Sequence, residues 1–219
     1  MSDLLPLFPL GTVVFPGMPI PLHIFEDRYR RMLTDRAESD PIFGAVLIRS
    51  GVDTDEARHL SPIGTATRLI SQRRRGGGRS DIVVQGTQRF EILDVRWDLG
   101  YGLATVEWRE EHVGDVLAVR ATMQEANDLF HRYVRGVTKL TGREFEGVQM
   151  SDDPIEASYD LASRLPLHTW ERQPLLEEDS AERRFVRLLQ IVRREVALLE
   201  RAGAAGLAIN HPGSLVNLN

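Results

Sequence analysis

The chain contains no cysteine and only one lysine, Lys139, among its 27 basic residues. The missing cysteine excludes disulfide bonds, thiol catalysis and thiolate metal ligands together. A phosphate-binding P-loop needs Gly-Lys-Ser/Thr after a glycine-rich approach, whereas Lys139 lies between Thr138 and Leu140. A Ser-Lys protease dyad needs the same lysine, which lies in a predicted helix without the required neighbours. We therefore expect neither P-loop ATPase nor Ser-Lys protease chemistry.

Long apolar runs are also missing. No run reaches the roughly 18 to 20 residues that a transmembrane helix requires, and no basic segment followed by an unbroken apolar core marks a signal peptide. We expect a cytoplasmic protein that makes no membrane contact. The formal net charge of -5 argues against general attraction to nucleic acid or anionic lipid, although it permits a local basic patch. A length of 219 residues fits one large domain or two small ones.

The polar residues show no enzyme or metal signature. The six histidines are scattered, without His-x-x-x-His or similar ligand spacing. His168 and Glu171 share a face of a predicted helix, but a metal site needs three or more convergent donors, so we interpret them as a surface pair. No Gly-x-Ser-x-Gly elbow supports a serine hydrolase. We expect a protein that is not an enzyme, with no catalytic residues, no metal and no cofactor.

The N-terminal stretch from Leu5 to Met32 is densely apolar and contains five prolines. Each proline removes an N–H donor and pushes the preceding residue toward extended backbone, so one continuous helix is excluded. Thr12 to Phe15 (TVVF) is typical of a strand, and the Phe-Pro-Gly at its end predicts a turn. From His23 onward the apolar residues recur at helical spacing, which predicts the first helix.

This stretch resembles a known family. Its letters PLFPLGTVVFPGMPIPLHIFEDRYRRM are closely similar to the opening signature of the Lon substrate-binding domain, the N-terminal domain of the ATP-dependent Lon proteases. The resemblance implies a PUA-like β-pseudobarrel and non-catalytic recognition of polypeptide. Since the P-loop and Ser-Lys patterns are missing, we expect a stand-alone member of the family that lacks the ATPase and protease domains.

Four more strands are predicted after the first helix, at Ile42 to Ile48, Ile63 to Ser71, Asp81 to Val95 and Tyr101 to Trp108. The third of these is one long bent strand or two paired ones, because a Gly-Thr pair interrupts it at residues 86–87. Several short strands with a single early helix indicate a compact β-barrel or sandwich. The segments IGTATRLI, QGTQRFEIL and YGLATVEW also resemble the family pattern, which favours the barrel.

From Asp115 to Leu140 the apolar residues recur at alternating three and four residues, a helical seam of more than three heptads. Such a seam is typical of a coiled-coil dimer, but extra apolar positions and missing flanking charges favour a helix packed inside its own bundle. Asp153 precedes a further helix, and Asp179 with Glu182 predicts a capping box at the start of the last one.

Resemblance to the family extends from Leu4 to Glu200, because YDLASRLPL and QPLLEEDSAERRFVRLL are similar to its helical half. We therefore predict an α+β protein in three parts. Residues 1–112 form a β-rich PUA-like barrel with one early helix, residues 113–202 form a C-terminal helical bundle, and residues 203–219 form a flexible or loosely docked tail.

The most basic segment reads RRRGGGR over residues 73–79. Guanidinium groups on a glycine loop can pair with phosphates or carboxylates, so we consider a nucleic-acid or acidic-partner contact formed by Arg73, Arg74, Arg75 and Arg79. A solvated hairpin tip explains the same residues, and we favour it because no aromatic residue is interleaved to stack bases. RNA binding through this loop is the alternative function.

Phe15, Met18 and Ile20 form the other candidate site. A turn fixed by prolines and bearing these side chains can present a preformed apolar surface to a peptide, although the same side chains can instead close the barrel end. We predict unfolded or apolar polypeptide segments as partners, together with a protease or a chaperone, and a monomer or weak homodimer. A small-ligand pocket between the two halves is a third alternative.

Overall fold

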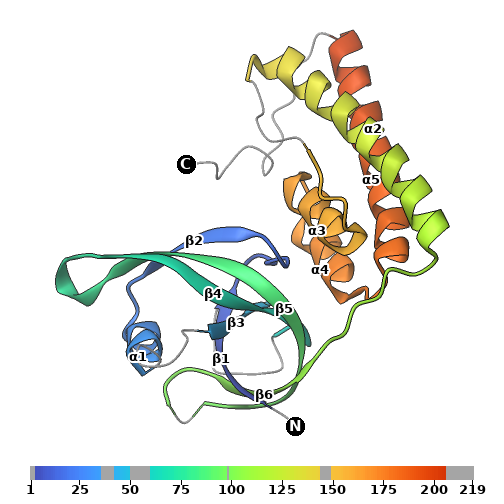
Figure 1. Cartoon of the computed structure of the whole chain (residues 1–219). Coiled ribbons are helices and arrows are strands. Elements are labelled where there is room, and N and C mark those ends of the chain that lie inside the picture. The colour runs from blue at the N-terminus through green and yellow to red at the C-terminus, as the bar shows by residue number, and fades with distance from the viewer. Residues whose placement is uncertain (1–2, 36–41, 50–59, 98, 144–148, 206–219) are drawn as a thin grey trace. The chain divides into compact units, whose positions relative to one another are not determined.

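The computed structural model describes residues 3–35, 42–49, 60–97, 99–143 and 149–205 of the chain. The chain divides into two compact units, Met1–Glu110 and Glu111–Asn219. The first unit consists of strands with one α-helix, and the second consists of helices (Figure 1). The predicted loop at 50–58 and all but the start of the predicted tail lie outside the described residues.

Six strands in the described ranges form the first unit. They are β1 (Asp3–Leu10), β2 (Pro19–Ile24), β3 (Ile42–Leu47), β4 (Ile63–Arg74), β5 (Ser80–Arg96) and β6 (Leu103–Trp108). Neighbouring strands follow the order β2-β5-β4-β3-β1-β6, and β5 also pairs with β6. The extra pairing closes all strands except β2 into a ring, to which β2 adds alongside β5. The predicted α+β class with a barrel is confirmed, and β5 is one long strand with bulges.

The strand β1 begins earlier than the sequence predicted, and its pairing explains how two prolines fit inside a sheet. Its first half pairs antiparallel with β6 from Asp3 to Pro6, and its second half pairs parallel with β3 from Leu7 to Leu10. Pro6 therefore has a pairing strand only on the β6 side, and Pro9 only on the β3 side. The position of the missing N–H can face the side without a partner strand. The predicted strand Thr12–Phe15 is wrong, because these residues follow β1 without strand structure.

The helix predicted from His23 begins later, because His23 and Ile24 complete strand β2. The strand pairs antiparallel with β5 along its whole length. Its residues Ile20, Leu22 and Ile24 pack against the core while their neighbours are exposed, which is the period of a strand rather than a helix. The helix α1 spans Asp27–Asp35.

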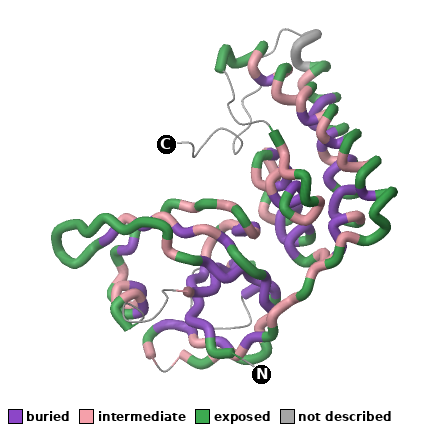
Figure 2. Tube along the Cα trace, in the orientation of Figure 1, coloured by how far each residue is buried: buried purple, intermediate pink, exposed green. Residues whose placement is uncertain are grey.

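Two clusters of buried apolar side chains fill the first unit, and Figure 2 shows many buried residues along the strands of the ring. One cluster surrounds Phe90, and the other includes Tyr29 and Met32 of α1. Two glycines make room for the Phe90 ring: an added Cβ would come within 2.5 Å of the ring at Gly44 and within 2.6 Å at Gly64. No larger residue fits at these two positions without moving the ring.

The second unit contains α2 (Val116–Thr141), α3 (Pro154–Arg164), α4 (Thr169–Glu177) and α5 (Ala181–Ala205). The long helices α2 and α5 run side by side (Figure 1). Phe130 and Val137 on α2 are buried, as are Phe185 and Val192 on α5. The apolar seam of α2 is thus covered inside its own unit, the arrangement that the sequence favoured over a coiled-coil dimer.

One predicted helix cap forms and one does not. Asp153 caps α3 by accepting two backbone N–H groups, as the sequence predicted. The predicted Asp179–Glu182 box is wrong, because the hydroxyl of Ser180 takes the capping position of α5. Glu182 Oε2 instead accepts the N–H of Asp115 at 2.8 Å. Glu182 therefore joins the start of α5 to the start of α2, a contact between distant segments that local spacing cannot indicate.

The largest polar side chain in the interior of the second unit is Arg184, which is fully buried. Its guanidinium donates to five acceptors at 2.6 to 3.1 Å: Leu175 O, Ser158 Oγ, Glu111 Oε2, Tyr159 OH and Glu178 O. The ring of Tyr159 lies 3.8 Å from the guanidinium carbon, and its hydroxyl donates to Glu111 Oε1 at 2.8 Å. This Arg184 network ties α5 to α3, to α4 and to the segments that contain Glu111 and Glu178.

Candidate functional site

One face of the β2–β5–β4 layer points away from the barrel core, and we call it the outer face. The register places two rows of side chains there: Pro21–Val83–Ser71 and His23–Asp81–Arg73. Ile82 and Val84, which alternate with these residues on β5, pack into the core instead. Alternation of this kind follows from the pleat of a strand. Residues from three strands are therefore brought together on one surface.

A shallow hollow of about 410 Å³ opens on this layer, and its lining includes both rows of the outer face. Pro21 and Val83 make part of it apolar. Phe25, which follows β2, adds an apolar group beside the His23 row: the residue is 58% exposed, and its ring stacks on that of His23 with centroids 5.9 Å apart. An exposed aromatic ring beside apolar neighbours is typical of a surface that binds a partner.

The other end of the hollow is charged. His23 Nδ1 lies 2.6 Å from Asp81 Oδ1, and Arg75 Nε donates to Asp81 Oδ2 at 2.6 Å. The hydrogen bonds from His23 and Arg75 lower the pKa of the Asp81 carboxyl below its ordinary value. Asp81 is therefore ionised at neutral pH, and both of its oxygens are already engaged within the protein.

The open edge of the layer is poorly suited to adding another strand. Among the described strands, β2 is the outermost of the sheet. Proline has no N–H to donate to β5, so the backbone N–H and C=O groups of Ile20 and Leu22 are the ones that face β5. The backbone of Pro19 and Pro21 faces outward. The outward edge lacks an N–H at both prolines, which hinders strand addition. A partner would therefore contact the outer face through side chains.

The structure separates the three residues of the predicted apolar site. Phe15 is completely buried, so its side chain packs inside the barrel unit and is not available to a partner. Met18 and Ile20 are half-buried, and Ile20 packs against the core cluster that contains Ile24. In the same stretch, every second residue from Pro19 to Phe25 is exposed, a strand period that could have indicated the outer face from the sequence. The apparent helical spacing from His23 onward hid this period.

The predicted basic segment is the tip of the β4–β5 hairpin, which extends beyond α1 in Figure 1 and is exposed in Figure 2. Gly77 and Gly78 have φ of 71° and 73°, the left-handed backbone that glycine tolerates. Arg75 pairs with Asp81, whereas Arg73 lines the hollow of the outer face. The remaining predicted contact residues are exposed as well. RNA binding by this loop stays a prediction.

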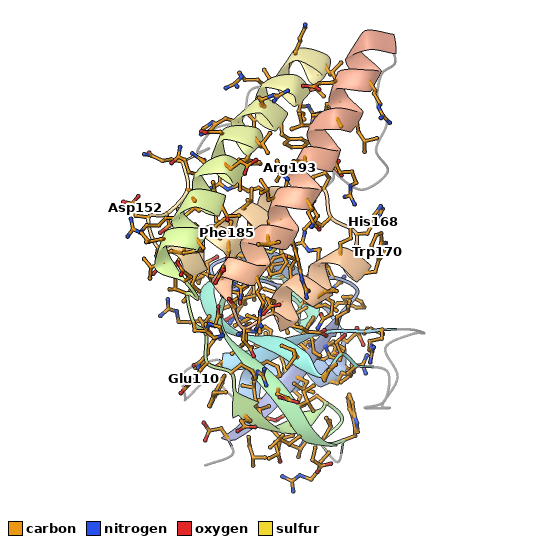
Figure 3. The ribbon with its side chains drawn as sticks, turned by 90° about the vertical axis from the view of Figure 1, so that its right-hand side faces the viewer. Glu110, Asp152, His168, Trp170, Phe185 and Arg193 are labelled. Atoms are coloured by element: carbon orange, nitrogen blue, oxygen red, sulfur yellow. The ribbon has the colours of Figure 1, made fainter. Side chains whose placement is uncertain are left out.

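The second unit has surface features of its own. A hollow of about 430 Å³ lies along α2 and is lined in part by Met123, His131 and Met150. His168 and Trp170 stack with ring centroids 5.9 Å apart, and Figure 3 shows them side by side at the surface. The predicted surface pair of His168 and Glu171 is wrong in its location, because Glu171 is buried. Its Oε2 accepts the backbone N–H of His168 at 3.1 Å, and its Oε1 accepts a hydrogen bond from Arg194 at 2.5 Å.

In the described residues, no group of three or more side chains is placed to hold a metal ion. Within the same ranges, no helix has the length and apolar character needed to cross a membrane.

The family model of the "ATP-dependent protease La (LON) substrate-binding domain" matches residues 4–194. Two similar curated proteins are both named Lon protease. The one from Heliobacterium modesticaldum is 30% identical over 200 residues, which are 90% of this chain and 24% of that protein. The one from Syntrophus aciditrophicus is 25% identical over 207 residues, 91% of this chain and 26% of that protein. The chain thus spans about a quarter of the length of these relatives.

Solved structures show the same similarity. The Lon N-terminal domain protein from Xanthomonas campestris superposes with a TM-score of 0.61 at 27% identity, over 86% of this chain and 98% of that one. The N-terminal domain of a Mycobacterium avium complex Lon protease superposes with a TM-score of 0.62 at 18% identity, over 87% of this chain and 98% of that one. The second match bears on the fold alone, and both agree with the predicted PUA-like barrel followed by helices.

Proposed function

The chain belongs to the family of Lon substrate-binding domains, and from this premise we propose that it binds unfolded or apolar segments of other polypeptides. The matched domain is non-catalytic and is distinct from the ATPase and protease domains of Lon. On this proposal the chain holds a segment for a protease or a chaperone, and the reaction itself takes place elsewhere.

The observation that supports the proposal most is the apolar part of the outer face. Pro21 and Val83 line an open hollow, and the ring of Phe25 is more than half exposed beside it. Burial of such groups by a partner removes apolar surface from water at about 25 cal/mol per Å². Proline adds a rigid surface that loses little conformational entropy on binding. The outer face therefore suits a segment that offers apolar side chains.

The proposed mode of binding follows from the edge of β2. Pro19 and Pro21 remove two backbone donors that strand addition would use. A bound segment lies on the face, along the strands, and is held by its side chains, so no ladder of backbone hydrogen bonds fixes its register. This mode tolerates many sequences, as a receptor for unfolded segments requires.

The test measures binding of a fluorescently labelled, permanently unfolded polypeptide by anisotropy. Phe25→Asp and Val83→Asp each place a charge at an apolar position, Val83 in the lining of the hollow and Phe25 beside His23. We expect each to weaken binding about tenfold, because the lost burial of one such side chain is worth roughly 1.5 to 3 kcal/mol when complete. Far-ultraviolet circular dichroism during thermal unfolding checks that each variant keeps its fold.

Leu93→Asp is the matched control. Leu93 is 56% exposed on the same strand, β5, but does not line the hollow. It should bind like the unmodified protein. Equal weakening by Leu93→Asp, or unchanged binding by both outer-face variants, would show that the segment binds elsewhere. Replacement of Phe15 is not a binding test, because that side chain is buried and its loss disturbs the fold.

A further inference from the structure

At the charged end of the hollow, some charged side chains form ion pairs and one does not. Asp81, the one acidic residue in the lining, is already hydrogen-bonded to His23 and Arg75. Arg73 stands in the same row of the outer face, opposite Asp81 in the register of β4 and β5. Arg73 is exposed, and no acidic side chain in the described residues lies within ion-pair distance of it. The hollow therefore ends at a cation that forms no ion pair within the described part of the protein.

The surroundings add to this positive charge. Arg74 and Arg79 lie at the same hairpin and are exposed as well. Between residues 73 and 81 there are four arginines and one acidic residue, Asp81. A guanidinium at the end of an apolar surface is complementary to a carboxylate, which it can bind through two parallel N–H groups. The hairpin thus favours a negative charge at this end of a bound segment.

We propose that the outer face selects polypeptide segments in which an acidic residue stands two positions from an apolar one, with the carboxylate at Arg73 and the apolar side chain at Val83. This inference rests on the proposed function and specifies its substrate class. Under this inference, affinity depends on the amino-acid sequence of the segment and not only on its being unfolded.

The spacing follows from the register. Val83 and Asp81 are two residues apart on β5, and Ser71 and Arg73, their partners on β4, are also two residues apart. Residues two apart in an extended chain lie on the same side, separated by about 6.5 to 7 Å. An extended segment lying along these strands therefore presents an apolar-x-acidic pattern to the two rows at once. Neighbouring residues of the segment point away from the surface.

The test compares labelled peptides that differ at one position: apolar-x-Glu, apolar-x-Gln and apolar-x-Lys, with otherwise neutral flanks. We expect the Glu peptide to bind about three- to fivefold more tightly than the Gln peptide at low salt, the range of an exposed ion pair. The Lys peptide should bind more weakly than both. Added salt should reduce these differences, because exposed charges are screened.

Reversing the charge of Arg73 tests whether this residue binds the acidic side chain. Arg73→Glu should reverse the order, so that the Lys peptide binds best. Arg74→Glu is the matched control, because Arg74 pairs with Ser80 in the neighbouring row, whose side chains alternate to the other side of the sheet. It carries the same change of charge at the same hairpin and should keep the original order.

The outcomes separate this inference from the proposed function. Reversal by Arg73→Glu with retention by Arg74→Glu supports the assignment. Equal effects of the two variants would overturn it in favour of a diffuse positive field. Equal affinity for all three peptides would overturn it while leaving polypeptide binding intact. If none of the peptides and no unfolded polypeptide binds, the proposed function fails with it.

Discussion

Replacement of Arg184 by methionine should unfold the helical unit far more easily, because the Arg184 network depends on one guanidinium. Methionine retains much of the length and apolar volume of arginine but donates no hydrogen bond. The variant leaves the five acceptors without their donor, among them one carboxylate oxygen of Glu111. Glu111, whose side chain is largely buried, then loses its ion pair with the Arg184 guanidinium.

The size of the effect follows from these contacts. An unmatched buried acceptor costs roughly 1 to 3 kcal/mol, so five would cost about 5 to 15 kcal/mol if nothing relaxed. Two features lower this sum: the Glu111 side chain is 15% exposed and can reach water, and the Tyr159 hydroxyl still donates to it. We expect a loss of about 3 to 5 kcal/mol in unfolding free energy, the range for removing one partner of a buried ion pair.

Urea unfolding followed by far-ultraviolet circular dichroism measures this loss. Arg183→Met is the matched control: the neighbouring arginine pairs with Glu178, and its side chain is 65% exposed. We expect the control to change the unfolding free energy by less than about 1 kcal/mol. If Arg184→Met lies within about 1 kcal/mol of the unmodified protein, the network does not carry the stability assigned to it.

Two further predictions concern the barrel and the helical unit. Gly86→Ala should lower the unfolding free energy by about 1 to 3 kcal/mol in a urea titration, because its Cβ would lie 2.2 Å from the carbonyl oxygen of Phe15. Gly76→Ala is the control: its Cβ would meet nothing within 4 Å, so the unfolding free energy should not change. Burial, together with the charge of Glu195, raises the pKa of Tyr133 to about 12. The folded state then holds this proton while the unfolded chain releases it near the ordinary value of 10, so stability present below pH 10 is lost as the pH rises toward 12. Tyrosinate absorbance of the protein minus that of Tyr133→Phe should titrate at the higher value, and a midpoint near 10 would contradict the assigned burial.

The elements that the sequence predicted well are those with a repeated apolar spacing and a local cap. The helix predicted from the apolar seam that ends at Leu140 and the Asp153 cap of α3 depend on residues close in the chain, and both form, the first as α2. The resemblance to the Lon family added the barrel topology, which no local pattern contains. Strand pairing across the ring, and the closure of β5 onto β6, depend on residues far apart in the sequence.

The errors arose where tertiary pairing overrides local preference. Thr12–Phe15 has strong strand propensity, yet the strand is β1, where a change of partner accommodates Pro6 and Pro9. His23 looked like the start of a helix, although its partner Asp81 keeps it in β2. The outer face could not be assembled from the sequence, because its rows combine residues from three strands. Burial of Phe15 follows from the same long-range packing.

The most direct test of the central claim is amide chemical-shift mapping by NMR, using the isotope-labelled protein and an unlabelled unfolded polypeptide. Binding at the outer face predicts that the shifts concentrate on residues 20–25, 69–73 and 81–85, and that Phe25→Asp removes them. Shifts confined to the helices α2–α5, or to the hairpin tip at residues 74–79, would contradict the account.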